Sequence, residues 1–392
     1  MQGFVCEMLF GIQKSKDIKL SNISRALSET IPLIKTEDRL CRNLASKDLS
    51  QHINETLCRL ASNKINDNDV IAIDPGDIMK PYAKEMEGLC STWDGDKKTN
   101  ATGYHLCQIV IANTEHTKVI PTYSHVWSSK EDDYIDRHTE LFKAIDTLTK
   151  HIGNKGIWAI DREGDDNTII QKFIADEKKF VTRLKYNRLI FLGKSIYRMQ
   201  DFVKKVETPF MAKLINQDQD AKKEITISYG ATPIQLNGIK EKLIALLVKG
   251  FGEKPMVLIT NLDISTFDAD ETFSILKNYL TRWKCDETYR YIKQAYNLED
   301  VRVRSLIAIK NTVALVMAVA YFAIIYMGES LKLKVMKEKL FIFAKRFFAV
   351  PIFFCYAMAD GIFNLLKSSQ VPFNKNEYDF DRNIFQLNFD FD

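Results

Sequence analysis

Two short apolar runs that each end in an aspartate constrain the fold of this chain more than any other feature. Residues 70–73 end at Asp74, and residues 156–160 end at Asp161. Short apolar runs of this kind predict buried strands. Because ligand and metal sites of open α/β sheets gather at the carboxyl ends of strands, we expect the two aspartates at one site.

The segments around these runs predict an α/β order. Residues 103–112 and 118–126 are strand-like, residues 133–152 and 169–174 are helical, and residues 180–184 return to strand. The predicted order is therefore three strands, a helix, a strand, a helix and a strand. This order is expected of an RNase H-like α/β core, a mixed sheet flanked by helices in which the first and fourth strands lie side by side.

The chain divides into five regions around this core. Residues 1–65 repeat apolar residues at helical spacing with basic residues between them, so this region could bind DNA, although a solvated basic face explains it equally well. Residues 66–184 hold the first part of the core and residues 185–262 a β-rich insertion. We expect the second part of the core, with the catalytic helix, in residues 263–330, and a C-terminal helical region and tail in residues 331–392.

Composition is that of a globular protein and limits the possible partners. Of the 392 residues, 46% are hydrophobic and 27% are charged. The formal charge of +4 is too small to indicate nucleic acid by itself, so charge for DNA would have to lie in patches. The 7 cysteines form no CxxC pair, which argues against structural zinc and disulfides and indicates the cytoplasm. The first residues carry no signal pattern.

Residues 312–327 form an uninterrupted apolar run, which raises the alternative of a membrane-associated helical protein. The run falls short of the roughly 20 residues that are needed to span a bilayer. We therefore expect a buried core helix here and no membrane partner.

The helix expected over residues 273–295 presents one face rich in charge. Surface salt bridges are the commoner explanation for such residues taken alone. The helix follows a core with two strand-end aspartates, however, and its face is rich in residue types that bind phosphate. Five side chains fall on or near one line along it: Tyr279, Arg282, Asp286, Arg290 and Lys293.

Asp74, Asp161 and Asp286 together suit divalent cations, because Mg²⁺ prefers carboxylate and water oxygens. Two ions about 3.5–4 Å apart can activate a water or 3′-hydroxyl and stabilise the leaving oxygen of a phosphodiester. We therefore expect two Mg²⁺ ions, with Mn²⁺ as a substitute. The expected phosphate-binding residues are Tyr279, Arg282, Arg290 and Lys293.

Three blocks of the chain match the motifs of a known family. They are residues 72–78, residues 158–162, and the set Tyr279, Arg282, Asp286 and Lys293 at its spacing. These blocks resemble bacterial insertion-sequence transposases of the DDE (RNase H-like) type, which carry a tyrosine-arginine-glutamate-lysine signature. The resemblance covers roughly residues 70–327, and its third block is the most specific.

The resemblance implies a cut-and-paste DNA transposase with Asp74, Asp161 and Asp286 as its catalytic, metal-binding residues. Such an enzyme would bind terminal inverted repeats, pair two ends as a homodimer, nick with water and join the freed 3′-hydroxyl to target DNA. Its partner would be double-stranded DNA, and its location the cytoplasm, in association with the nucleoid.

The chain departs from the family pattern in two places. Asp286 stands where the family has glutamate; register and helix face favour Asp286 as the third acid, with Glu287 as the alternative. The turn after Asp161 lacks the usual leading glycine, so Asp165 and Asp166 receive no role. These departures support a second interpretation, a DNA-binding transposase copy with impaired catalysis.

A basic cluster lies near the start of the expected insertion. It could line a DNA path, and a solvated charged face is an equal alternative. Its members are Lys178, Lys179, Arg183, Lys185 and Arg188.

Overall fold

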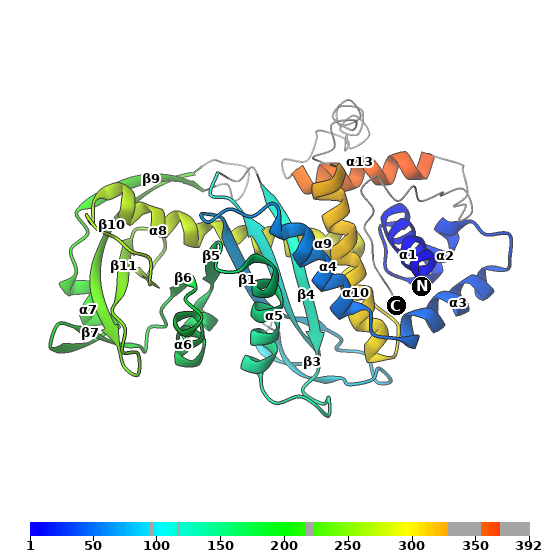
Figure 1. Cartoon of the computed structure of the whole chain (residues 1–392), viewed down its shortest axis with the longest axis horizontal. Coiled ribbons are helices and arrows are strands. Elements are labelled where there is room, and N and C mark those ends of the chain that lie inside the picture. Colours follow the sequence, from blue (N-terminus) through cyan, green and yellow to red (C-terminus); the bar gives the residue numbers. More distant parts are fainter. Residues whose placement is uncertain (95–97, 116–117, 217–222, 328–353, 369–392) are drawn as a thin grey trace.

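The computed structural model describes residues 1–94, 98–115, 118–216, 223–327 and 354–368 of the chain. It is an elongated mixed α/β structure with one large sheet and helices on both faces of that sheet (Figure 1). Helices gather at one end, and strands of the expected insertion form the other end. The mixed α/β class predicted from the sequence is confirmed.

Four helices precede the sheet: α1 (Gln2–Ser15), α2 (Leu20–Leu27), α3 (Leu33–Ser46) and α4 (Ser50–Ser62). Their apolar residues recur at helical spacing and are buried in the main core. One of the basic side chains between them has a structural partner, because Arg39 contacts the buried Glu7 at 2.5 Å and Glu29 at 2.8 Å.

The first part of the core has the strand and helix order that the sequence predicts, with one short strand, β2, that it does not. β1 pairs antiparallel with β3 and parallel with β5, and β5 pairs parallel with β6. The first and fourth predicted strands therefore lie side by side, as expected. The elements are β1 (Val70–Met79), β2 (Cys90–Asp94), β3 (Thr99–Ala112), β4 (Val119–Trp127), α5 (Arg137–Ile152), β5 (Ile157–Ile160), α6 (Asn167–Ala175) and β6 (Lys179–Arg183).

The prediction that the first strand ends at Asp74 is wrong, because β1 continues to Met79. β1 pairs with β3 along its whole length but with β5 only over its first three residues. Beyond that point no strand of the described residues pairs with this edge of β1, so Pro75, which has no N–H to donate, is tolerated. Pro-Gly is a common turn signal, but an edge without a partner strand allows it to remain within a strand.

The segment expected as an insertion extends the same sheet. β12 pairs antiparallel with β6, and β11 and β10 follow outward in the strand order. A second apolar cluster joins core strands β5 and β6 to β10, β11 and helix α8. The elements are β7 (Leu189–Leu192), β8 (Ser195–Arg198), α7 (Met199–Lys205), β9 (Phe210–Asn216), β10 (Lys223–Leu236), β11 (Leu243–Lys249) and β12 (Met256–Thr260).

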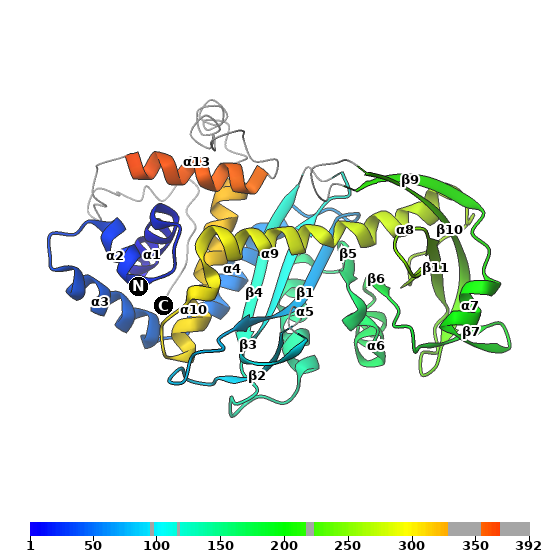
Figure 2. The ribbon, with the colours of Figure 1, turned by 180° about the vertical axis from the view of Figure 1, so that it is seen from behind.

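The long helix expected over residues 273–295 is two helices in line, α8 (Ala269–Thr281) and α9 (Trp283–Tyr296), interrupted at Arg282. At the joint Arg282 N donates to Tyr279 O, and Cys285 N donates to Arg282 O. These bonds span three residues rather than four, which tightens the turn. α8 and α9 cross one face of the sheet, and α4 and α5 lie on the opposite face (Figures 1 and 2).

Helix α10 (Leu306–Tyr321) continues as a π-helical turn, Phe322–Tyr326. By length and composition it could cross a membrane, but 83% of its most apolar window is buried inside the structure, as the core-helix prediction requires. Its Asn311 accepts a hydrogen bond from Leu49 N and donates to Leu44 O and Lys47 O. α10 therefore fastens the N-terminal helices to the sheet.

The C-terminal helical region and tail expected over residues 331–392 are described only in part. Helix α13 (Phe354–Ser368) is the described portion, and it packs against the π-helical turn of residues 322–326. The remainder of the predicted region lies outside the described residues.

Candidate active site

The three predicted acids come from three different elements that meet at one edge of the sheet. Asp74 lies in β1 just past the point where β1 parts from β5, and Asp161 directly follows β5. Asp286 lies in the first turn of α9, which packs on β1 and β3 through Ala72, Val110 and Cys285. The topology of the sheet and the packing of α9 on it thus bring together side chains that are far apart in the sequence.

Arg282 lies between two of these acids. Its Nη1 and Nη2 each donate to one oxygen of Asp286 at 3.1 Å, which makes a bidentate ion pair. The same Nη1 is 3.7 Å from Asp74 Oδ1. Only 8% of Arg282 is exposed, so its charge acts in a poorly solvated setting where ion pairs are strong.

The pKa values show that the acids are electrostatically coupled. Burial raises the pKa of Asp74 to about 7, and the negative charges of Asp286 and Asp161 add to the rise, against the lowering effect of Arg282. Burial also raises the pKa of Asp286, again opposed by Arg282. The site is therefore a cluster of three carboxylates with one buried guanidinium among them, and it is short of positive charge.

The donor chemistry of this cluster fits a hard divalent cation, because every candidate ligand is a carboxylate. Among the residues that the structure describes, no three ligating side chains are close enough together to hold a metal ion. Arg282 occupies the space between Asp286 and Asp74. A cation that bound these aspartates would have to displace the guanidinium from Asp286.

Glu287, the alternative third acid, has a different partner. Its carboxylate accepts a hydrogen bond from Lys284 Nζ at 2.7 Å, on the neighbouring face of α9. Asp286, in contrast, pairs with Arg282, whose guanidinium also approaches Asp74. The geometry thus favours Asp286 over Glu287 as the acid that faces the two strand-end aspartates.

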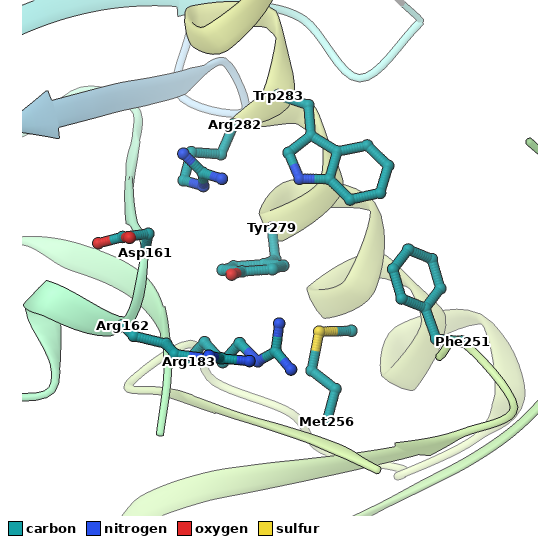
Figure 3. Close-up of a pocket in the computed structure, with 8 residues that line it drawn as sticks. All are labelled: Asp161, Arg162, Arg183, Phe251, Met256, Tyr279, Arg282 and Trp283. Carbon is teal, nitrogen blue, oxygen red and sulfur yellow. The ribbon is translucent and has the colours of Figure 1, made fainter. Parts of the chain in front are cut away.

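A pocket of about 280 Å³ opens beside Asp161 (Figure 3). In it the Tyr279 ring lies between the side chains of Arg282 and Arg183. Guanidinium groups bind phosphate, and aromatic rings stack on bases, so this lining suits a nucleotide unit of a nucleic acid. The lining residues are Asp161, Arg162, Arg183, Phe251, Met256, Tyr279, Arg282 and Trp283.

The structure separates the four predicted phosphate-binding residues. Tyr279 and Arg282 line the pocket. Arg290 is exposed about one helical turn beyond Asp286. Lys293 lies near the end of α9, where its ammonium is 2.7 Å from Glu299 and 4.4 Å from the centre of the Tyr289 ring. Lys293 therefore has partners within the protein and does not line the pocket.

Several pocket residues were missed by the sequence interpretation. Trp283 is 42% exposed and directly follows Arg282; a tryptophan on a charged helix is a signal that could have been used. Phe251 and Met256 come from the expected insertion, and the Phe251 and Trp283 rings are 5.6 Å apart. Nothing in the local sequence of Phe251 or Met256 indicates that they would reach this site.

The turn after Asp161 explains why the next two aspartates are not free to act as ligands. A Cβ on Gly164 would lie 2.0 Å from Ile160 Cγ2, so this tight 3-10 turn requires glycine. Asp165 is buried and accepts a hydrogen bond from Lys185 N. Asp166 caps α6 by accepting from Thr168 N. Both carboxylates therefore serve the local structure.

No protein-family model matches the chain, and no curated protein is similar to it in sequence. A solved structure with a related arrangement is the piggyBac transposase synaptic complex with hairpin DNA. The two share 9% sequence identity with a TM-score of 0.42, over 86% of this chain and 56% of that one. The chain thus spans about half the length of that transposase. A likeness at this level supports no conclusion about function.

The raised pKa of Asp74 predicts a pH-dependent stability. The folded-state pKa of about 7 lies above the ordinary value of 3.8, so the folded chain keeps a proton that the unfolded chain releases. The free energy of unfolding should therefore fall as the pH rises from 3.8 to about 7. In urea unfolding with chelator present, the free energy of unfolding of the wild type should fall between pH 5 and pH 8 by on the order of 2 kcal/mol more than that of Asp74→Asn.

The control for this measurement is Asp67→Asn, which changes an exposed aspartate in the turn before β1. It should keep the pH dependence of the wild type. If Asp74→Asn also kept that dependence, the assignment of a raised pKa to buried Asp74 would be wrong.

Proposed function

We propose that the chain is a metal-dependent DNA transposase of the DDE type, with an RNase H-like core in which Asp74, Asp161 and Asp286 bind two Mg²⁺ ions. The observation that carries the proposal is the meeting of these three aspartates, from β1, the end of β5 and α9, around one guanidinium. The pocket rich in arginine and aromatic side chains opens directly beside them.

The strand order supports the RNase H-like assignment. Within the sheet β3, β1, β5 and β6 are neighbours, and β4 pairs with β3. Among the described strands, only the β1–β5 and β5–β6 pairs are parallel. This is the arrangement in which the first and fourth strands of the core deliver acids side by side. The third acid then comes from a helix that follows the core strands, as α9 does.

Each group in the site has a defined task under this proposal. Bound metal ions would activate the attacking water or 3′-hydroxyl and stabilise the leaving oxygen. Arg183 and Tyr279 would hold the DNA strand in the pocket, with Trp283 available to stack on a base. Arg282, once released from Asp286, would offset charge on the transferring phosphoryl group.

The wider assignment follows from the family resemblance of the motifs. The substrates would be the terminal inverted repeats of an insertion sequence and target DNA, with a homodimer forming on paired ends. The enzyme would carry out cut-and-paste transposition in the cytoplasm, in association with the nucleoid, with Mn²⁺ as a substitute for Mg²⁺.

The direct test of this function is a nicking assay. A duplex carrying one end of the element that encodes the chain is incubated with protein and Mg²⁺, and any nick is mapped. We expect a nick at the element boundary, and its loss, by more than a hundredfold, in Asp161→Asn and Asp74→Asn with end binding retained. Cleavage by either variant at the wild-type rate would overturn the assignment.

A catalytically impaired DNA-binding copy is the second candidate, because Asp286 is one methylene shorter than glutamate and is held by Arg282. Asp286→Glu distinguishes the two. An impaired natural chain should gain at least tenfold in nicking rate, whereas an active one should change by less. Glu287→Asp, which shortens the neighbouring acid, is the matched control and should leave nicking unchanged in either case.

A further inference from the structure

A second cavity, of about 360 Å³, is lined in part by Asp165, the residue after the 3-10 turn that follows Asp161. Three chain segments that are distant in sequence build it: the start of α6, the connection between β6 and β7, and the connection between β10 and β11. Its polar lining comprises Asp165, Asn167, Lys185, Asn187, Arg188 and Asn237.

The walls of this cavity are fastened by hydrogen bonds between the segments. Asn167 Nδ2 donates to Asn237 O at 3.0 Å, and Gln171 Nε2 donates to Gly238 O at 2.9 Å. These bonds tie the β10–β11 connection to α6. The cavity is therefore a formed feature of the junction between the core and the inserted strands.

Arg188 is oriented before any ligand arrives. Its Nε is 3.2 Å from Asp165 Oδ1, and its Nη2 donates to Asn167 Oδ1. The Asp165 side chain is 1% exposed, and its other oxygen accepts from Lys185 N, so its charge is used within the protein. The Arg188 side chain is 21% exposed. A guanidinium held in this way binds a phosphate at a small entropic cost.

Further donors surround this guanidinium. Lys185 is exposed at the same cavity, with its ammonium 3.2 Å from Asp165 O. The side-chain amides of Asn187 and Asn237 are exposed and have no protein partner among the described residues. Asparagine amides and lysine ammonium groups are common phosphate and sugar contacts in DNA complexes. The lining therefore favours an anion with several acceptor oxygens.

The two pockets are joined by a short segment at the end of β6. Arg183 lines the pocket beside Asp161, and Lys185 lines the second cavity, with the buried Leu184 between them. Arg183 is the last residue of β6, and Lys185 lies two positions beyond it, so one short segment contributes a cation to each pocket.

We propose that the second cavity binds a backbone phosphate of the DNA strand whose scissile phosphate lies beside Asp161, at a nearby position along that strand. This inference rests on the proposed function and adds a DNA-positioning site to it. It also divides the basic cluster: Lys178 is buried, and its ammonium donates to Gly153 O and Asn154 Oδ1, so it takes no part. Lys185 and Arg188 are the members that hold the phosphate.

The test places negative charge in the cavity without disturbing the Arg188–Asp165 pair. The variant is Asn187→Asp with Asn237→Asp, and the matched control is Asn63→Asp with Asn100→Asp, two exposed asparagines elsewhere on the chain. Binding is measured with the full chain and a fluorescent 30-base-pair duplex, and with the corresponding single strand, over a series of salt concentrations.

We expect the cavity variant to bind about tenfold more weakly at low salt, with a shallower salt dependence, and the control to bind within about twofold of the wild type. A loss confined to one of the two probes identifies whether duplex or single-stranded backbone occupies the cavity. Equal binding by cavity variant and control, with both probes, would overturn the inference while wild-type nicking still supported the proposed function. A wild type that neither binds nor nicks DNA would overturn both.

Discussion

The structure around the candidate site depends on a balance of charge: three carboxylates meet at a sheet edge, and one buried guanidinium offsets them. Burial raises the pKa of Asp74 to about 7, and repulsion by the carboxylates of Asp286 and Asp161 adds to the rise. Arg282 relieves part of this repulsion by pairing with Asp286 and approaching Asp74. Because Arg282 offsets only part of the negative charge, such a site would attract further positive charge, for example a divalent cation.

The strands of the expected insertion contribute to the candidate site because they belong to the same sheet. β12 extends the core beyond β6, and the chain leading into β12 carries Phe251 to the pocket beside Asp161. The same turn that positions Asp161 then forms one wall of the second cavity through Asp165. Residues before and after this short turn therefore line the two cavities, and under the proposed function a strand of nucleic acid could be held at both.

Sequence patterns predicted the parts of this site that depend on local order. Asp74 and Asp161 follow apolar runs, and Asp286 with Arg282 lies on one helical face; these patterns are visible in the chain itself. The length of β1 was not predicted, because the tolerance of Pro75 depends on where β5 ends. The break between the two helices at Arg282 and the presence of Phe251 and Met256 in the pocket were not predicted either. Both depend on packing between distant segments, which local sequence patterns do not encode.

If Asp74, Asp161 and Asp286 form one cation site, the chain should bind a divalent cation through all three in the absence of DNA. Titration with Mn²⁺, followed by electron paramagnetic resonance, measures free against bound metal. We expect Asp161→Asn and Asp286→Asn each to weaken Mn²⁺ binding by at least about tenfold, although the two residues lie on different elements, and Glu287→Gln to leave it unchanged. Equal binding by the wild type and both aspartate variants, or a loss only with Glu287→Gln, would contradict the single cation site.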